Sequence, residues 1–218
     1  MKISILCTDS NHPIVPHLLG WQEDMRSSGH KVFLFYDKKD ICGGDILFLV
    51  SCSQLIRSAE RAKYRVVLVL HASDLPNGRG WSPHVWSIVN GASEITVCLI
   101  EADDPVDTGA IWLLKKIALE GHELQPEINA KLFEAETILM TEAVERFEQI
   151  KPLIQTGNPG PFLPKRTPEN SRIDPNKTIA EQFDLLRVVD SERYPAFMDY
   201  RGRRYLIKLE KVAKDEST

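Results

Sequence analysis

Two residues suited to acid–base chemistry, His71 and Asp107, stand at the ends of apolar runs in this 218-residue chain. His71 follows the run 64–70, and Asp107 lies in the acidic loop 101–109 between two other runs. A carboxylate beside an imidazole fixes its tautomer and stabilises its protonated form, as in many general acids and bases. A histidine at a strand end is more often a hydrogen-bonded surface residue, and an aspartate before Thr-Gly is more often a turn former. Residue types alone therefore leave both interpretations open.

The elements that would bring these two loops together follow from the apolar pattern. We predict strands at residues 2–7, 32–36, 45–50, 64–70, 94–100 and 110–117. We predict helices at 14–25, 55–62 and 126–150, and a short helix that begins after an N-cap at Ser82. The helix at 126–150 has an apolar stripe of Ile128, Leu132, Ala135, Leu139 and Ala143. Near-continuous apolar strands that alternate with helices are typical of βαβ units. We therefore expect an α/β domain with a mostly parallel sheet over residues 1–155.

The composition changes after Ile150, where proline and glycine become frequent. We predict a small C-terminal appendage over residues 156–218, made of a loop, a short helix and a β-hairpin. Thr178 and Glu181 form the capping box of that helix, and a turn at Arg201-Gly202 would join strands 196–200 and 204–209. The apolar face of the helix is expected to carry Ile179, Phe183 and Leu186.

Composition excludes several classes of protein. The net charge of −4 lacks the basic field of a nucleic-acid-binding protein, and no apolar run approaches the roughly 20 residues that span a membrane. The apolar stretch 3–7 is too short for a signal peptide. The four cysteines form no CxxC pair and have no histidine at metal spacing, so we expect buried free thiols in a reducing cytoplasm and no metal site.

Open α/β sheets bind ligands beyond the carboxyl ends of their strands, which directs attention to residues 8–13, 51–53 and 71–83. The loop 8–13 lacks the GxGxxG spacing of a dinucleotide site, so an NAD-type cofactor is not expected.

One block of residues in this region resembles a known family signature. The block contains His71-Ala72-Ser73-Asp74-Leu75-Pro76, Arg79-Gly80, Pro83, Gly91, Asp103 and Asp107-Thr108-Gly109. In this order and spacing it resembles the N10-formyltetrahydrofolate-dependent formyltransferases, in register and without insertion over residues 66–112. The resemblance implies a Rossmann-like core and direct transfer of a formyl group from N10-formyltetrahydrofolate to an amine.

The resemblance also implies roles for individual residues. His71 and Asp107 would be the catalytic pair: His71 would take the amine proton or stabilise the oxyanion, and Asp107 would hold His71. By position, the cofactor would lie against two segments. These contain Ser51, Cys52 and Ser53, and Glu101, Ala102, Asp103 and Asp104.

One position departs from the signature. The family has an asparagine two residues before the histidine, where it donates a hydrogen bond to the oxyanion, and this chain has Val69. Loss of such a donor can cost roughly 10²–10³ in rate. Three alternatives stay open. Another donor substitutes, such as a backbone N–H, Ser73 or Asn77; protonated His71 carries the charge alone; or the chain is a weakened enzyme that serves as a folate- or nucleotide-binding module.

The acceptor is a further question, because acceptors in the family include methionyl-tRNA, glycinamide ribonucleotide and nucleotide-linked amino sugars, and some relatives hydrolyse the cofactor. The short segment after residue 155 and the acidic chain disfavour tRNA. The stretches 165–169, 173–174 and 193–197 are similar to those of sugar N-formyltransferases, so we expect a nucleotide-linked amino sugar destined for a surface glycan. Lys165 and Arg166 would neutralise its diphosphate, unless they are only solvated loop charges.

Other acceptor contacts are expected around the same edge of the sheet. The candidates are Asp9, Asn11 and His12 in the first loop, with Arg79 and Trp81 near the Arg-Gly turn. We expect His12 to be a loop hydrogen-bonder rather than a second base, and Trp86 to belong to the core. A C-terminal hairpin is a common element of dimer interfaces or sheet edges, so a homodimer remains a possible assembly.

Overall fold

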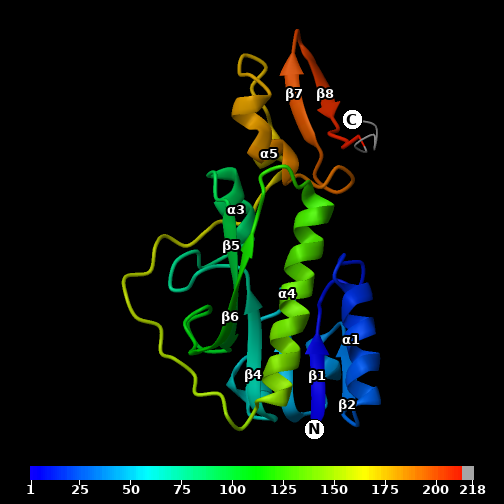
Figure 1. Ribbon diagram of the computed structural model, residues 1–218, viewed down its shortest axis with the longest axis vertical. Helices are drawn as coiled ribbons and strands as arrows, with labels where there is room; N and C mark the ends of the chain where they lie inside the picture. Colours follow the sequence, from blue (N-terminus) through cyan, green and yellow to red (C-terminus); the bar gives the residue numbers. More distant parts are fainter. Residues whose placement is uncertain (213–218) are drawn as a thin grey trace, which may run out of the picture.

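The computed structural model describes residues 1–212 and has a six-stranded sheet at its centre (Figure 1). The strand order is β2-β1-β3-β4-β5-β6; the first four are parallel, and β5 runs antiparallel to β4 and β6. The predicted Rossmann-like α/β core with a mostly parallel sheet is therefore confirmed. The strands are β1 (Lys2–Leu6), β2 (Lys31–Phe35), β3 (Gly44–Leu49), β4 (Tyr64–His71), β5 (Glu94–Glu101) and β6 (Ile111–Ala118).

Helices cover the sheet, and the main apolar core lies under the two longest of them. The helices are α1 (Val15–Ser27), α2 (Ser58–Arg61), α3 (Pro83–Val89), α4 (Gln125–Glu145) and α5 (Phe183–Arg187), with 3₁₀ turns at Lys38–Asp40, Pro168–Ser171 and Ala180–Gln182. The predicted stripe of α4 is buried along its whole length, because its spacing of three and four residues keeps it on one helical face. The helix ends at Glu145, five residues before the expected end, and a turn closed on the Arg146 carbonyl follows.

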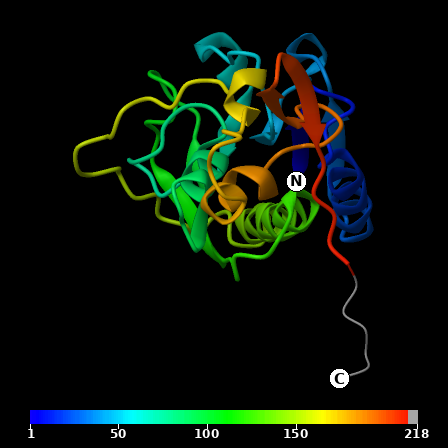
Figure 2. The same cartoon turned by 90° about the horizontal axis from the view of Figure 1, so that it is seen from above.

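The C-terminal part forms the predicted hairpin, β7 (Ala196–Tyr200) and β8 (Arg203–Ile207), which stands with α5 beyond one end of the sheet (Figures 1 and 2). The capping box of Thr178 and Glu181 is present. The prediction for Ile179 is wrong, because its side chain is 56% exposed. A 3₁₀ turn precedes α5, and its tighter winding takes Ile179 off the face that Leu186 buries.

A long segment joins the end of α4 to this C-terminal part and passes along the β5–β6 side of the sheet (Figure 1). It is attached at two places by isolated backbone bridges, Ile111 with Leu153 and Gly80 with Leu163. The division of the chain at residue 155 stays a prediction, and residues 213–218 of the expected appendage lie outside the described residues.

Two further expectations concern membranes and thiols. Within residues 1–212, no helix has the length and apolar character that crossing a membrane requires. Cys7 and Cys98 are buried free thiols, as expected, but Cys42 is exposed and Cys52 is half-buried. The prediction is wrong for Cys42 because it lies in the turn that leads into β3 rather than in a strand.

Candidate functional site

His71 and Asp107 lie together at the end of β4. The His71 Nδ1 atom is 3.5 Å from Asp107 Oδ1, and the two side chains are 7% and 13% exposed. The His71 Nε2–H group donates to the Gly78 carbonyl at 2.9 Å. A carbonyl can only accept, so Nε2 carries a proton, and Nδ1 faces the carboxylate of Asp107. A carboxylate at this distance can orient the ring and compensate positive charge that develops on it.

Backbone geometry fixes this pair. Asp107 has a left-handed conformation (φ +61°), and its Oδ2 atom accepts a hydrogen bond from the Gly80 N–H at 3.0 Å. A Cβ atom at Gly109 would lie 1.9 Å from the Glu101 carbonyl oxygen. The glycine of the Asp-Thr-Gly sequence is thus required by a close approach of the loop to the end of β5.

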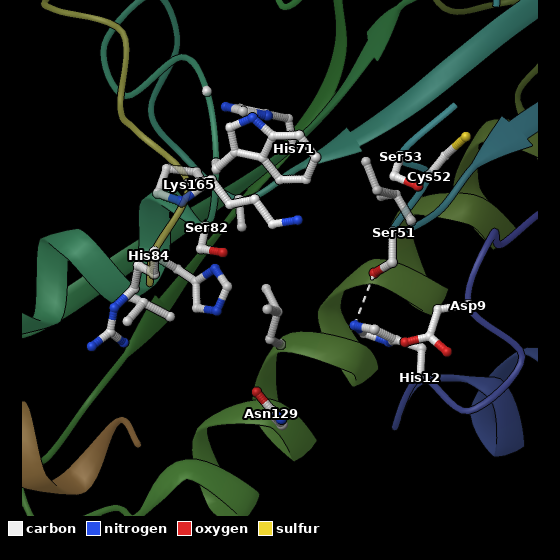
Figure 3. Close-up of a pocket in the computed structure, with 18 of the residues that line it drawn as sticks. Asp9, His12, Ser51, Cys52, Ser53, His71, Ser82, His84, Asn129 and Lys165 are labelled. Atoms are coloured by element: carbon white, nitrogen blue, oxygen red, sulfur yellow. Dashed lines mark hydrogen bonds between the residues drawn. The ribbon is translucent and has the colours of Figure 1, made fainter. Parts of the chain in front are cut away.

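A cavity of about 670 Å³ opens beside the pair, a size typical of small-molecule sites. Three of the four non-glycine residues with positive φ among residues 1–212 line it: Ser51, Ser82 and Asp107. Left-handed backbone concentrates at functional sites. Ser82 was expected to cap α3, but in this conformation its side chain makes no cap hydrogen bond. Its hydroxyl group belongs to the cavity wall instead (Figure 3).

The cavity gathers many, but not all, of the predicted site residues. Asp9, His12, Ser51, Cys52, Ser53, His71, Trp81, Asp107, Lys165 and Arg166 line it. Asn11, Arg79, Glu101, Ala102, Asp103 and Asp104 do not. Glu101 instead accepts a hydrogen bond from Trp112, Asp104 pairs with Arg61 at 2.6 Å, and Arg79 donates to Gln155. The cofactor and acceptor roles of all these residues stay predictions.

His12 has the contacts of a loop hydrogen-bonder. Its Nδ1 atom accepts from the Ile14 N–H at 3.3 Å, and its Nε2 atom lies 3.2 Å from the Ser51 hydroxyl (Figure 3). Burial, and then the charge of Arg193, lowers the pKa of His12. Because Nδ1 accepts, the proton sits on Nε2, and both nitrogens are engaged. These contacts agree with the expected structural role.

A basic wall closes the cavity on the side of the C-terminal segment. The ammonium group of Lys165 lies 5.1 Å from the centre of the Trp81 ring, and the guanidinium of Arg166 lies 5.8 Å from that of Trp86. Trp86 donates its indole N–H to the Pro164 carbonyl, so it anchors this wall without lining the cavity. Burial lowers the pKa of Arg166, and its buried Nε–H has no hydrogen-bond partner in residues 1–212.

The Arg-Gly turn holds that wall in place. The Leu163 N–H donates to the Arg79 carbonyl at 2.7 Å, and the Trp81 N–H donates to the Leu163 carbonyl at 3.1 Å. A Cβ atom at Gly80 would lie 2.4 Å from the Leu163 oxygen. Gly80 therefore contacts both Asp107 of the His71–Asp107 pair and the segment that carries Lys165.

Several cavity residues were not predicted from the sequence, among them His84, Asn129 and Glu136. Burial raises the pKa of Glu136 to about 8. Burial, and then the charges of His71 and Arg166, lowers the pKa of His84 to about 4. A signal existed for Glu136, since it interrupts the apolar stripe of α4 next to Ala135. His84 offered a weaker one, as a histidine just after Ser-Pro and close in sequence to His71.

Val69 faces this region too. Residues two apart on a strand point to the same side, so Val69 and His71 share a face of β4. Val69 lines the cavity and packs against Leu75, Cys98 and Ile100. Ser73 and Asn77, the suggested replacement donors, do not line the cavity, and the Ser73 hydroxyl donates to the Asn77 backbone carbonyl at 2.9 Å.

Comparison with known proteins agrees with the family that the signature indicated. The formyl transferase family model matches residues 2–144, and the chain belongs to that family. A methionyl-tRNA formyltransferase of Flavobacterium johnsoniae is 34% identical over 146 residues, which are 64% of this chain and 46% of the relative. The chain thus spans about half the length of the curated relatives it matches.

Solved structures share the fold. A methionyl-tRNA formyltransferase from Clostridium thermocellum has a TM-score of 0.82 at 21% identity, covering 99% of this chain and 95% of its own. A 4-N formyltransferase from Francisella tularensis has a TM-score of 0.75 at 20% sequence identity, and the match covers 97% of this chain and 98% of that one. HypX from Aquifex aeolicus, in complex with tetrahydrofolic acid, has a TM-score of 0.78 at 20% sequence identity, and the match covers 96% of this chain and 37% of that one.

Proposed function

We propose that this chain transfers a formyl group from N10-formyltetrahydrofolate to the amine of a nucleotide-linked amino sugar. The observation that carries the proposal is the His71–Asp107 pair, held at 3.5 Å beside a cavity of about 670 Å³ in a member of the formyl transferase family. General acid–base or electrostatic assistance by such a pair accelerates acyl transfer.

The residues of the cavity fit a formyl donor of this kind. Leu49, Val69 and Leu55 supply apolar surface, and the loop 51–53 supplies polar groups at the end of β3. Small-molecule sites combine a mostly apolar lining with a few polar groups in this way. The bound donor would supply an activated formyl carbon, and this chain would orient it and stabilise charge on its oxygen.

The catalytic pair would work through electrostatics. His71 would donate its Nε2–H group to the negative charge that develops on the formyl oxygen. Asp107 would hold the His71 ring, and its bond from the Gly80 N–H would keep the carboxylate in place. Because the Gly78 carbonyl occupies Nε2, rotation of the His71 ring is part of this proposal; hydrogen bonds at catalytic groups often tighten only when substrate binds.

The basic wall supports a nucleotide-linked acceptor. Lys165 and Arg166 face the cavity, and the buried Arg166 Nε–H group lacks a partner. An oxygen of a diphosphate would satisfy that donor, and guanidinium groups match phosphate geometry well. Asn129 and the neutral carboxyl group of Glu136 are suited to hydroxyl groups of a sugar. We propose that the product is an N-formylated sugar for a surface glycan.

A second acceptor follows from the relatives, several of which are named methionyl-tRNA formyltransferases. The net charge of −4 does not favour a polyanionic acceptor, so methionyl-tRNA is the second candidate. Hydrolysis of the donor, or binding without turnover, are the remaining alternatives. The cytoplasmic location and the homodimer stay predictions from the sequence.

The test combines the donor with a panel of UDP-, dTDP- and GDP-linked amino sugars and with methionyl-tRNA. Tetrahydrofolate and the formylated product are measured separately. We expect turnover with at least one sugar, a loss of activity in His71→Ala, and full activity in His122→Ala, a matched histidine outside the cavity. Turnover only with methionyl-tRNA, or formate release without any acceptor, would contradict the sugar assignment. Equal rates for wild type and His71→Ala would contradict the mechanism.

A further inference from the structure

The second residue of α3, His84, is a cavity histidine that the catalytic pair does not use. Its ring points into the cavity from the side of α3, near Ser82 and Lys165 (Figure 3). The Nδ1 atom is buried and has no hydrogen-bond partner in residues 1–212. His12 and His71, by contrast, have both ring nitrogens engaged.

The environment of His84 determines its protonation state. The titratable and charged groups that line the cavity with it are Asp9, His12, Cys52, His71, Asp107, Glu136, Lys165, Arg166, Asp190, Arg193 and Tyr194. Burial, followed by the charges of His71, Arg166 and His12, lowers the pKa of His84 to about 4. A pKa this low favours the neutral imidazole at neutral pH.

A neutral imidazole has one N–H group, and the structure indicates which nitrogen carries it. A buried N–H without a partner is rarer in proteins than a buried acceptor without one. The orphaned Nδ1 atom is therefore the unprotonated nitrogen, and Nε2, the atom farther from the backbone, carries the hydrogen. His84 then presents a neutral N–H donor to the cavity.

The cavity needs such a donor, because Val69 provides none. Three of the other side-chain donors of the cavity are engaged or exposed. The Ser51 hydroxyl lies 3.2 Å from His12, the Ser53 hydroxyl lies 3.0 Å from Thr8, and Lys165 is exposed. A neutral imidazole can stabilise a developing oxyanion without taking up a proton, as a histidine of triosephosphate isomerase does.

We propose that the Nε2–H group of His84 donates a hydrogen bond to the developing negative charge on the formyl oxygen and so replaces the donor missing at Val69. This rests on the proposed function. The amine nitrogen forms a bond to the formyl carbon, and the carbonyl electron pair moves onto the oxygen, where His84 and His71 stabilise it. The electron pair returns from the oxygen to re-form the carbonyl group as the bond from that carbon to N10 of the donor breaks. The proton lost by the amine ends on N10. His84 keeps its own proton throughout.

The first test uses substitutions. His84→Phe keeps the ring but removes the donor, and we expect kcat to fall roughly 10²–10³-fold, as for loss of one oxyanion donor. The dissociation constant of tetrahydrofolate should stay within about twofold, since removing a transition-state interaction need not affect ground-state binding. His84→Gln, which retains an N–H, should recover part of the rate. The double variant Val69→Asn/His84→Phe should recover more, because it restores a donor on β4.

These variants separate the proposal from a structural or binding role. If His84 only binds the acceptor, His84→Phe raises KM and Val69→Asn does not restore the rate; that outcome overturns the proposal. Thermal unfolding of each variant identifies a folding defect. Full activity in His84→Phe also overturns the proposed role of His84. If the wild-type protein is inactive with every acceptor of the panel, the proposed function is overturned instead.

The second test does not depend on turnover. Protein carrying ¹⁵N-labelled histidine is titrated with formate in the presence of tetrahydrofolate, and the His84 signals are assigned by their absence from His84→Phe. We expect a neutral ring with the proton on Nε2, and a shift of that proton as a formate oxygen accepts its hydrogen bond. A proton on Nδ1, or an Nε2–H signal that does not respond to formate, contradicts the proposal whether or not an acceptor is found.

Discussion

Gly80 donates its backbone N–H to the Oδ2 atom of Asp107 at 3.0 Å, and this bond joins the two halves of the family signature. The other carboxylate oxygen faces His71 at 3.5 Å. Asp107 therefore stands between a fixed backbone donor and the imidazole. The same glycine is bridged to Leu163, so the turn that holds the Asp107 carboxylate also positions the basic wall.

The Asp107→Asn variant tests the charge at this position. The amide oxygen can still accept from the Gly80 N–H, so the loop should keep its conformation, but His71 loses the negative charge beside it. In another enzyme, an Asp-to-Asn change beside the catalytic histidine lowers kcat about 10⁴-fold. We expect kcat to fall by roughly 10²–10⁴ while the midpoint of thermal unfolding changes little. A variant with wild-type kcat would show that the charge is not used.

The Gly80→Ala variant tests the link to the basic wall. Gly80 has φ +109°, and the added Cβ would lie 2.4 Å from the Leu163 oxygen, so the segment that carries Lys165 must move. Gly91→Ala is the matched control, since Gly91 also has positive φ (+85°) but open space around its Cβ position. Both variants should lose roughly 1 kcal/mol or more of stability from backbone strain. Only Gly80→Ala should also raise KM for the acceptor, measured by steady-state kinetics.

Glu136 predicts a pH dependence of stability. Its pKa is raised to about 8 in the folded chain by burial, so the folded state binds a proton that the unfolded state releases near pH 4.5. The stabilising contribution is fully present below pH 4.5 and is lost as the pH rises toward 8. Urea unfolding of wild type between about pH 5 and pH 8 should therefore show stability falling. Glu136→Gln, which cannot ionise, should weaken that fall, and an unchanged slope would contradict the assignment.

From the positions of Lys165 and Arg166 we predict that KM for the nucleotide-linked sugar depends on salt concentration. Replacing both residues with alanine should raise KM for a nucleotide-linked sugar with a smaller effect on kcat, because the diphosphate is remote from the reacting carbon. The effect should shrink as ionic strength rises, since exposed charges are screened. Lys177→Ala, which removes an exposed charge outside the cavity, is the control. A double variant with unchanged KM would favour the interpretation that these are solvated loop charges.

Local sequence pattern predicted most of the fold. The six strands and the α4 stripe followed from apolar periodicity, because burial on both faces of a parallel sheet leaves near-continuous apolar runs. Ser82 and Ile179 were mispredicted because the local backbone differs from a regular helix start. A 3₁₀ turn displaced Ile179, and Ser82 has left-handed backbone in which its side chain makes no cap hydrogen bond.

The site was only partly predictable. The signature pointed to His71 and Asp107 because their spacing reflects adjacent loops at one edge of the sheet. His84, Asn129 and Glu136 contribute from helices, where one polar side chain among apolar neighbours has no distinctive spacing. The burial that shifts the pKa values of His84 and Glu136 arises only when α3, α4 and the C-terminal segment meet.

The most direct test of the proposed formyl transfer delivers N10-formyltetrahydrofolate with a ¹³C-labelled formyl carbon and follows the label by NMR, with the amino-sugar panel as acceptor. We predict that the label appears as a formamide carbon on a nucleotide-linked sugar with wild type, and that His71→Ala and Asp107→Asn abolish or greatly slow this transfer. Label recovered only as formate, or formamide formed at equal rates by wild type and His71→Ala, would contradict it.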